Sequence, residues 1–191
     1  MARALLVVDV QNDFCEGGAL GVTGGGGVAR GITEFIATHE SDYGLVVASR
    51  DWHDGDNDNG GHFAAVGEEP NYVTTWPVHC VAGTPGAQYH PELLLPPTTL
   101  HVKKGQGVPS YSMFEGTLDD GRGVEEILLH HGVTSVDVVG IATDHCVRAS
   151  ALDAREAGLD VRVVNYLVAA VSPETERYAR AQMSQAGVAF S

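Results

Sequence analysis

Short runs of apolar and β-branched residues recur along this chain, and longer segments with helical character separate them. A strand that is apolar on both faces is typical of a parallel sheet covered by helices. We therefore predict a single domain over residues 1–191, a three-layer α/β/α fold with a doubly wound, six-stranded parallel sheet. The predicted strands span 4–10, 43–50, 98–104, 134–142, 160–165 and 187–190, and the predicted helices span roughly 26–40, 120–131, 144–157 and 173–186.

Residues that start and end helices support these boundaries. Ser172 followed by Pro173 is typical of an N-cap and a first helical turn. Gly132, Gly158 and Gly187 suit helix ends. The stretch "TGGGG" is predicted to be a flexible turn before the first long helix. It lacks the Lys-Ser/Thr ending of a phosphate-binding P-loop, so it predicts no nucleotide site.

One long stretch, 51–97, does not follow the alternation. It is loop-like and rich in Gly, Pro, Asp, His and aromatic residues. Loops of this length inside a compact domain are usually functional or disordered. Its two tryptophans and its cysteine argue against disorder, so we predict an ordered, functional loop.

Composition narrows the partners and the compartment. The formal net charge is −14 and no Lys/Arg cluster is present, so nucleic acid is a poor candidate partner. No apolar run reaches membrane-spanning length, and the first residues lack the long apolar region and cleavage site of a signal peptide. Three cysteines are too few for a disulfide scaffold. They indicate a reducing cytosol, so we predict a cytoplasmic protein.

Reactive side chains follow four of the predicted strands. Asp9 comes at the end of the first strand, and Asp51 and His53 follow the second. Lys104 ends the third, and Cys146 follows the fourth. Because sites in doubly wound sheets form beyond the carboxyl ends of the strands, these side chains are expected to converge on one edge.

Cys146 lies between a buried strand and a helix, where it can be a nucleophile, a metal ligand or a small buried side chain. His145 and Asp144 are one and two positions away and do not face it on a helix, so a base should come from another strand. Asp9 is the natural candidate, and Lys104 would hold that carboxylate. The helix start is expected to favour the thiolate.

The long loop contains candidate metal ligands. Asp51 and His53 are two apart and point to the same side of an extended segment. With His62 and His79 they form a set of one carboxylate and three imidazoles, which suits Zn²⁺, Fe²⁺ or Mn²⁺. Their spacing is irregular, and a histidine in a loop is usually a surface residue. The stretch "DGDNDNGG" lacks the glycine register and the bidentate Glu of an EF-hand, so it is expected to be a solvated acidic turn.

Four separate motifs, in order, carry a resemblance to a known family. They are "VVDVQNDFCEGGAL", the group "DWH", "HF" and "WPVHCVAGTPGA", then "VKKG" and "GIATDHCV". Together they make the chain resemble the nicotinamidase family of the isochorismatase-like cysteine hydrolase superfamily over nearly its whole length. That family has a parallel six-stranded sheet between helices, which agrees with the predicted strands.

The resemblance implies roles for particular residues. The catalytic triad would be Cys146, Asp9 and Lys104. The backbone N–H groups of Ala142 and Cys146 would form an oxyanion hole, with a cis peptide bond before Ala142. The metal ligands would be Asp51, His53, His62 and His79, and the residues at or near the ring pocket would be Phe14, Trp76, Tyr111 and His145.

The resemblance also implies an activity. Nicotinamide and water would become nicotinate and ammonia through a cysteine thioester, in NAD salvage, with pyrazinamide as a side substrate. One divalent metal ion is expected, with zinc the first choice before iron or manganese. The expected partner is the small-molecule substrate, with neither nucleic acid nor membrane, and the chain would act as a monomer or a homo-oligomer.

Three alternatives compete with this interpretation. A related amidase acting on carbamoyl or ureido substrates would be expected to lack the Asp-His-His-His set. An isochorismate-type ether hydrolase would not need Cys146. A catalytically silent metal-binding or interaction protein would not need Asp9, Lys104 and Cys146 together. The remaining histidines are expected at the surface or at helix ends, and Cys15 and Cys80 are expected to be buried or bystander thiols; these histidines are His39, His90, His101, His130 and His131.

Overall fold

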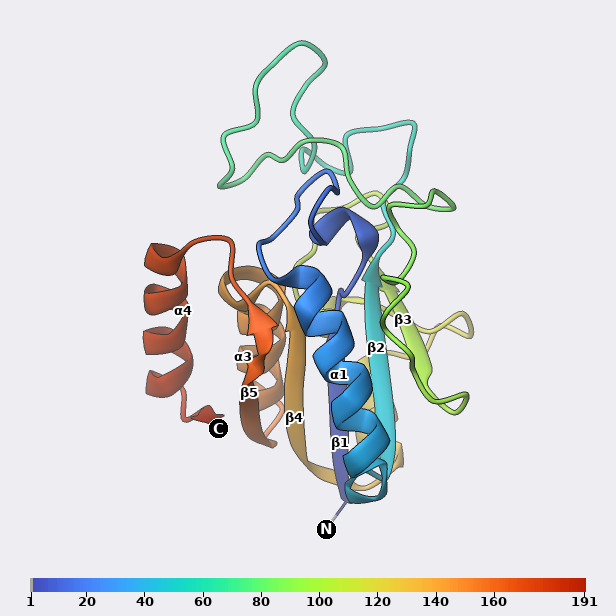
Figure 1. Ribbon diagram of the computed structural model, residues 1–191. Helices are drawn as coiled ribbons and strands as arrows, with labels where there is room; N and C mark the ends of the chain where they lie inside the picture. Colours follow the sequence, from blue (N-terminus) through green and yellow to red (C-terminus); the bar gives the residue numbers. More distant parts are fainter. Residues whose placement is uncertain (1) are drawn as a thin grey trace.

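A computed structural model describes residues 2–191, and its six strands form one parallel sheet in the order β3-β2-β1-β4-β5-β6 (Figure 1). The strands are β1 (Ala2–Val8), β2 (Leu45–Asp51), β3 (Leu100–Lys104), β4 (Val133–Ile141), β5 (Asp160–Ala169) and β6 (Ala189–Phe190). The α-helices are α1 (Gly25–His39), α2 (Val124–His130), α3 (Arg148–Glu156) and α4 (Pro173–Gln185).

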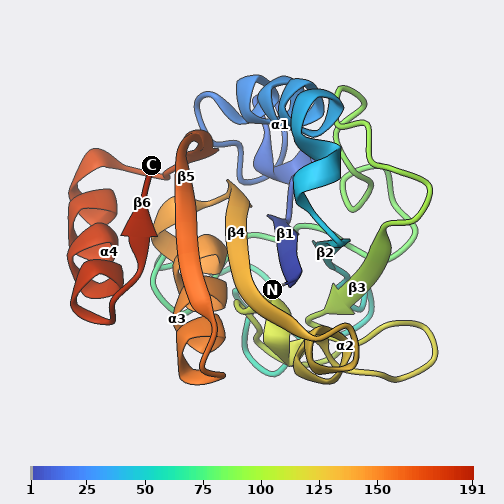
Figure 2. The ribbon, with the colours of Figure 1, turned by 90° about the horizontal axis from the view of Figure 1, so that it is seen from below.

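Helices cover both faces of the sheet, which confirms the three-layer α/β/α prediction. Figure 2 shows α1 on one face and α2 and α3 on the other. Alternate residues of β1 point to opposite faces, as the strand pleat requires. Leu5 and Val7 pack with α1, whereas Leu6 and Val8 pack with the cluster that includes α2, α3 and α4.

The strand order reverses direction beside β1. The chain runs from β1 outward to β2 and β3, and then returns to β4 on the other side of β1. A crevice forms at the carboxyl ends of strands where the order reverses in this way. The ends of β1 and β4 therefore mark the expected position of a site.

Several boundaries differ from the sequence-based expectation, among them the start of α2, which begins at Val124 and not at 120. Helix α1 begins at Gly25, so most of the stretch expected to be a flexible turn is helical. The Glu16 carboxylate accepts hydrogen bonds from the Gly24 N–H (2.5 Å) and the Gly26 N–H (2.9 Å), which satisfies backbone donors at this helix start. Hydrogen bonds from backbone N–H groups lower the pKa of Glu16, and the bond from Gly26 has the largest effect. Strand β5 continues to Ala169, four residues past its predicted end.

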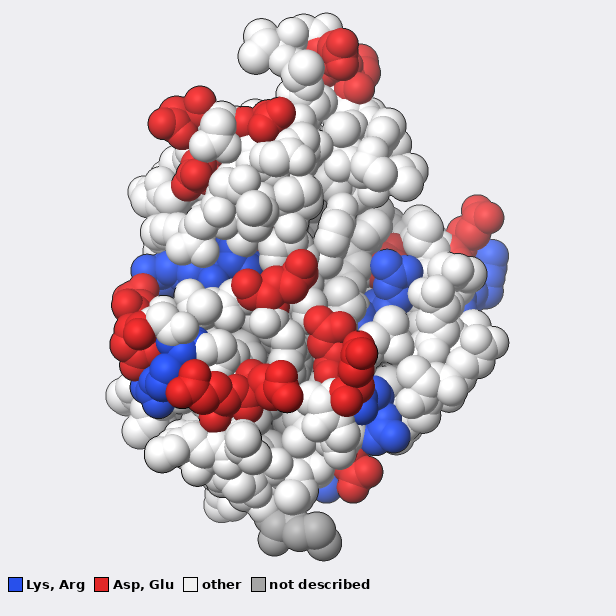
Figure 3. All heavy atoms as spheres, turned by 180° about the vertical axis from the view of Figure 1, so that it is seen from behind, with Lys and Arg blue, Asp and Glu red and all other residues white. Residues whose placement is uncertain are grey.

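The segment between β2 and β3 contains neither helix nor strand; its first part lies beyond the carboxyl ends of the strands, and its last part runs back beside the sheet to the start of β3 (Figure 1). Isolated bridges order it, joining His53 to Val81 and Phe63 to Trp76. Within residues 2–191, no helix is both long and apolar enough to cross a membrane. On the face shown in Figure 3, acidic and basic side chains lie side by side over the body, and the upper part carries acidic groups on an otherwise uncharged surface.

Candidate active site

The predicted reactive residues meet at the carboxyl ends of the strands. Asp9 directly follows β1, Asp51 is the last residue of β2, and Lys104 is the last residue of β3. Cys146 lies in the turn that follows β4. All four side chains are buried, although each of them can carry a charge. Buried ionisable groups persist only when they are paired, so this edge of the sheet is a functional candidate.

Lys104 connects the carboxylates with the thiol. Its ammonium nitrogen lies 3.0 Å from Oδ2 of Asp9 and 3.8 Å from Sγ of Cys146. It also forms an ion pair with Asp51. The Ser49 hydroxyl donates to Oδ1 of Asp9 at 2.7 Å, which fixes the other carboxylate oxygen. The structure therefore places the predicted base, cation and nucleophile within contact distance.

The electrostatics keep the thiol protonated in the free protein. Burial raises the pKa of Cys146 well above its ordinary value, and the Asp9 and Asp51 charges raise it further, against the lowering effect of Lys104. The expectation that the helix start favours a thiolate stays a prediction, because burial and the two carboxylates dominate the pKa of this thiol. Burial also raises the pKa of Asp9, against the effect of Lys104, which makes this carboxylate a stronger base.

The turn that carries Cys146 is irregular. The Ile141–Ala142 peptide bond is cis, as the resemblance implied. Residues Thr143–Val147 then form a π-helical turn before α3 begins at Arg148, which corrects the predicted helix start at 144. The N–H groups of His145 (3.0 Å) and Val147 (3.1 Å) both donate to the Ala142 carbonyl. The N–H of Cys146 lies between these two donors in the chain.

The sequence placed Asp144 only at the start of a predicted helix. The structure gives it a second role. Its buried carboxylate accepts from the Val171 N–H (3.0 Å), from the Ser172 N–H (3.4 Å) and from the Thr175 hydroxyl. The Ser172 hydroxyl caps α4 by accepting from the Thr175 N–H at 3.2 Å, which confirms the predicted N-cap. Asp144 thus ties the start of α4 to the turn that holds Cys146.

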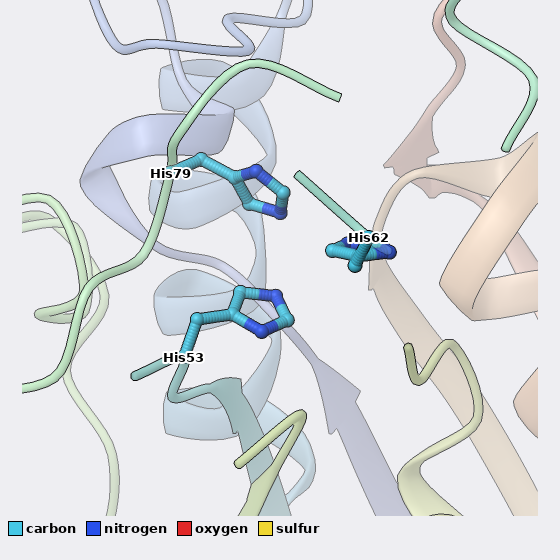
Figure 4. A group of neighbouring side chains, drawn as sticks. All are labelled: His53, His62 and His79. Carbon is cyan, nitrogen blue, oxygen red and sulfur yellow. The ribbon is translucent and has the colours of Figure 1, made fainter. Parts of the chain in front are cut away.

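Three histidines from the long loop gather beside the triad. One ring nitrogen from each of His53, His62 and His79 lies within 4.8 Å of the others, and all three residues are buried (Figure 4). Oδ2 of Asp51 lies 3.6 Å from Nε2 of His53 and 3.7 Å from Nε2 of His79. The Nδ1 atoms of the same two histidines hydrogen-bond the carbonyls of Gly105 (2.7 Å) and Pro77 (2.8 Å), which leaves Nε2 free to ligate.

These side chains fit a divalent metal ion. Within residues 2–191, Nε2 of His53 and Nδ1 of His62 are buried without a hydrogen-bond partner, which is costly unless a ligand completes them. Burial, with the nearby His53 and His79, lowers the pKa of His62 to about 3, so its ring is neutral as a metal ligand must be. Burial alone would raise the pKa of Asp51. The Lys104 charge and the contacts with His53 and His79 outweigh burial and hold that pKa well below its ordinary value. Nitrogen and carboxylate donors of this kind are typical of zinc sites.

A cavity of about 440 Å³ opens onto this group. Its lining includes Cys146, Asp51 and all four residues expected near a ring pocket. Trp76 donates from Nε1 to the Tyr111 hydroxyl (2.9 Å), and His145 meets the Trp76 ring edge-on at 5.2 Å between centroids. Such walls suit a flat aromatic molecule. The four wall residues are Phe14, Trp76, Tyr111 and His145.

Gln11 is a supporting residue that sequence reasoning missed. Its amide nitrogen donates to the carbonyls of Asp51 and Ala87 (both 2.9 Å), and its amide oxygen accepts from the Asp51 N–H (2.8 Å). Asp13 likewise accepts from the Cys80 N–H at 2.7 Å, directly after His79. Both lie in the polar run "QNDF" that follows β1, and a polar run at a strand end was the available signal.

The remaining histidines and thiols lie outside the site. Cys15 and Cys80 are buried free thiols, as expected, and burial is the first cause of a raised pKa in both. His39 and His90 are partly exposed, and the other three histidines are exposed at the surface: His101, His130 and His131.

Comparisons with known proteins agree with this geometry. The family model described as Isochorismatase domain matches residues 3–191. The chain is 48% identical to a nicotinamidase/pyrazinamidase of Mycobacterium tuberculosis, over 97% of this chain and 96% of that protein. Its structure resembles a pyrazinamidase of Pyrococcus horikoshii in complex with zinc, with a TM-score of 0.86 and 35% identity over 100% of this chain and 99% of the other. It also resembles a protein of L. infantum in complex with nicotinate, with a TM-score of 0.83 and 32% identity over 100% and 92% of the two chains.

Proposed function

Because the chain belongs to the isochorismatase family, we propose that it hydrolyses nicotinamide to nicotinate and ammonia through a thioester on Cys146. The observation that supports this proposal is that Cys146 lines an aromatic-walled cavity beside the three clustered histidines, with Lys104 in contact with both Cys146 and Asp9 behind it. The names of its relatives, a nicotinamidase/pyrazinamidase and a zinc-bound pyrazinamidase, supply the substrate class.

The first half of the reaction forms the thioester. Asp9 takes the proton of the Cys146 thiol, and the sulfur attacks the amide carbon. The oxyanion that develops is stabilised by the backbone N–H groups of Ala142 and Cys146. The Asp9 carboxyl then returns its proton to the leaving nitrogen, and the carbon–nitrogen bond breaks to release ammonia. Lys104 stays protonated and keeps the Asp9 carboxylate in place, because Asp51 and Asp9 raise the pKa of Lys104 well above its ordinary value despite burial.

The second half consumes water. Asp9 takes a proton from a water molecule that attacks the thioester carbon, and the same two N–H groups again stabilise the oxyanion. The carbon–sulfur bond breaks, Cys146 recovers its proton from Asp9, and the acid product becomes nicotinate by giving its proton to solvent, where ammonia takes it up as ammonium. One water is consumed for each ammonia released, and the enzyme returns to its starting state.

The cavity walls and the histidine cluster position the ring. Phe14, Trp76, Tyr111 and His145 would enclose it, and burial lowers the pKa of His145, which keeps this wall uncharged. The group Asp51, His53, His62 and His79 would hold one divalent ion, which we propose to be zinc. When bound, that ion supplies a Lewis acid toward the ring nitrogen of the substrate. The same pocket should accept pyrazinamide.

We further propose that the chain is a single domain acting in NAD salvage in the cytoplasm. The three free cysteines support a reducing compartment. The family match across residues 3–191 supports the single domain.

A direct ammonia-release assay tests the proposed activity. Wild-type protein of known metal content is offered nicotinamide, pyrazinamide and a panel of ureido amides. We expect turnover of the two aromatic amides, loss of turnover in Cys146→Ala with metal still bound, and retained turnover in Cys15→Ala, which removes a buried thiol outside the cavity. A preference for ureido amides would favour the related amidase, and retained activity in Cys146→Ala would refute the assigned nucleophile.

A further inference from the structure

Tyr72 is a strained residue that the proposed reaction does not explain. Within residues 2–191, four residues other than glycine have a positive φ: Asp9 (47°), Asn59 (50°), Tyr72 (56°) and Cys80 (46°). A bulky side chain rarely adopts this conformation, and such strain collects at functional sites. Asp9 is the proposed base, Cys80 follows the proposed ligand His79, and Asn59 orders the turn that leads to His62.

A network around Asn71 holds the backbone of Tyr72 in this conformation. The Asn71 side-chain oxygen accepts from the N–H groups of Val73 (2.9 Å), Thr74 (2.8 Å) and Thr75 (3.0 Å). The N–H of Asn71 donates to the Thr75 hydroxyl (3.0 Å), and the N–H of Tyr72 donates to the Thr75 carbonyl (3.0 Å). So many bonds within five residues over-determine the turn, which is the condition under which strain persists.

The turn places the Tyr72 ring at the mouth of the cavity. Tyr72 lines the cavity although 57% of it is exposed, so it lies at the solvent end. Its ring meets Trp76 edge-on, with 6.2 Å between centroids. Cys146, at the opposite extreme, is 7% exposed. An aromatic amide whose carbonyl carbon lies at Cys146 therefore occupies a cavity that the Tyr72 ring also lines, next to Trp76.

We propose that Tyr72 is a specificity-determining residue that forms the outer wall of the ring pocket, and that Asn71 is the positioning residue that holds it there. This inference rests on the proposed function and adds a size limit to it. Asn71 does not line the cavity, so it acts only through the turn. The wall would admit a single aromatic ring and reject bicyclic aromatic carboxamides.

The test removes the ring while keeping the turn. Tyr72→Gly suits the purpose, because glycine adopts a positive φ without strain. We expect KM for nicotinamide to rise about tenfold while kcat stays within about twofold, since an apolar wall contact contributes to binding on that scale. We also expect kcat/KM for a bicyclic aromatic carboxamide to rise relative to nicotinamide. Tyr178→Ala, which removes another exposed tyrosine outside the cavity, should change neither quantity.

Two variants of Asn71 test whether this residue positions the Tyr72 ring or only stabilises the fold. Asn71→Ala removes the acceptor of three N–H groups and should raise KM as Tyr72→Gly does, whereas Asn71→Asp keeps an acceptor and should stay near wild type. In the double variant Asn71→Ala/Tyr72→Gly, KM should rise no further than in Tyr72→Gly, because both changes act through one ring. A further rise would overturn the positioning role.

The outcomes also separate this inference from the proposed function. Wild-type protein that releases no ammonia from nicotinamide refutes the proposed function, and this inference with it. Active wild-type protein, together with unchanged KM and selectivity in Tyr72→Gly, refutes this inference alone and leaves the proposed function in place. Thermal melts of each variant establish that it is folded.

Discussion

Charge balance around one ammonium group governs the chemistry at the scale of single residues. Lys104 lies between two buried carboxylates and a buried thiol, and it is the one cation among the four. Burial raises the pKa of Cys146, and the negative charges of Asp9 and Asp51 raise it further against Lys104, so the thiol is protonated before substrate binds. The nucleophile therefore forms only when Asp9 takes the proton.

Asp9→Asn should make the Cys146 thiol easier to ionise and, at the same time, reduce turnover. The substitution removes a negative neighbour that raises the pKa of Cys146 while Lys104 remains, so the thiolate should appear at lower pH than in the wild type. Ammonia release should nevertheless fall by at least about 100-fold, because the base is lost. The pH dependence of iodoacetamide labelling at Cys146, with Cys146→Ala as the blank for the other two thiols, measures the first effect. If the labelling profile of the variant moves to higher pH, the account of the thiol is wrong.

Lys104→Met tests how much the buried ammonium group stabilises the fold, and the same change at the adjacent Lys103 is the comparison. Removing one partner from a buried ion pair leaves the Asp9 charge uncompensated, which should lower the free energy of unfolding by about 3–5 kcal/mol at neutral pH. The loss should shrink as pH falls, because without Lys104 the pKa of buried Asp9 rises further and protonation neutralises it. Lys103→Met is the matched control, since Lys103 pairs with the exposed Asp119 and should contribute less than about 0.5 kcal/mol. Urea denaturation at two pH values measures both variants, and equal losses would contradict the buried-pair account.

Elements are joined to the site by polar tethers rather than by apolar packing alone. Asp144 connects the π-helical turn of the nucleophile with the start of α4, and Gln11 connects the end of β2 with the long loop. The turn after β5 that Asp144 holds also lines the cavity, through Val171 and Ser172. The nucleophile and one cavity wall are thus set by the same carboxylate.

Asp144→Ala should loosen both the nucleophile turn and α4. It removes the acceptor for two N–H groups and the Thr175 hydroxyl, at a cost of about 1–2 kcal/mol because Val171 and Thr175 are partly in contact with water. Turnover should fall as well, because the nucleophile turn is no longer tied down. Glu174→Ala, an exposed acid in the first turn of α4, should cost only a few tenths of a kcal/mol. Thermal melts and ammonia-release rates measure the two variants, and equal effects would show that Asp144 is not a tether.

At this scale the sequence predicted every strand but not all of their ends. Apolar runs are strong signals, and β1, β2 and β4 differ from prediction by only a few residues. The predicted end of β5 at Asn165 was wrong because the strand is irregular there: Val138 pairs with Val163, whereas Gly140 pairs with Val168. Asn165 and Tyr166 are exposed at this irregularity, so the polar signal marked an interruption of the strand.

The whole molecule divides into a sheet that provides the reactive groups and a loop that provides most of the proposed ligands. Asp9, Lys104 and Cys146 come from strand ends or the turn after a strand, and doubly wound topology makes their meeting predictable. His62 and His79 come from a loop whose path depends on contacts such as those of Gln11 and Asp13. The resemblance named both histidines, but irregular spacing alone could not place them, and neither the Asn71 turn nor the Asp144 tether has a local sequence signature.

Removing the metal should weaken both the fold and substrate binding. The ion would join the end of β2 to the long loop, so a chelator should lower the melting temperature, and ion at a thousandfold excess over its Kd should restore about 4 kcal/mol. KM for nicotinamide should rise more than kcat falls. His53→Ala should abolish the melting shift, whereas His101→Ala, an exposed histidine, should keep it. Differential scanning calorimetry with and without zinc measures the shift, and an unchanged melt and KM in verified metal-free protein would refute the site.

The scarcity of lysine has a practical consequence for optical work. The sequence contains only two lysines, Lys103 and Lys104, and they are adjacent on β3. Lys104 is buried and paired, whereas the Lys103 side chain is 23% exposed and its amine lies over the Trp52 ring. A succinimidyl-ester dye would therefore mark Lys103 alone among the side chains. It would place a fluorophore beside a tryptophan that directly precedes His53, close enough to report ligand binding by energy transfer without an engineered cysteine.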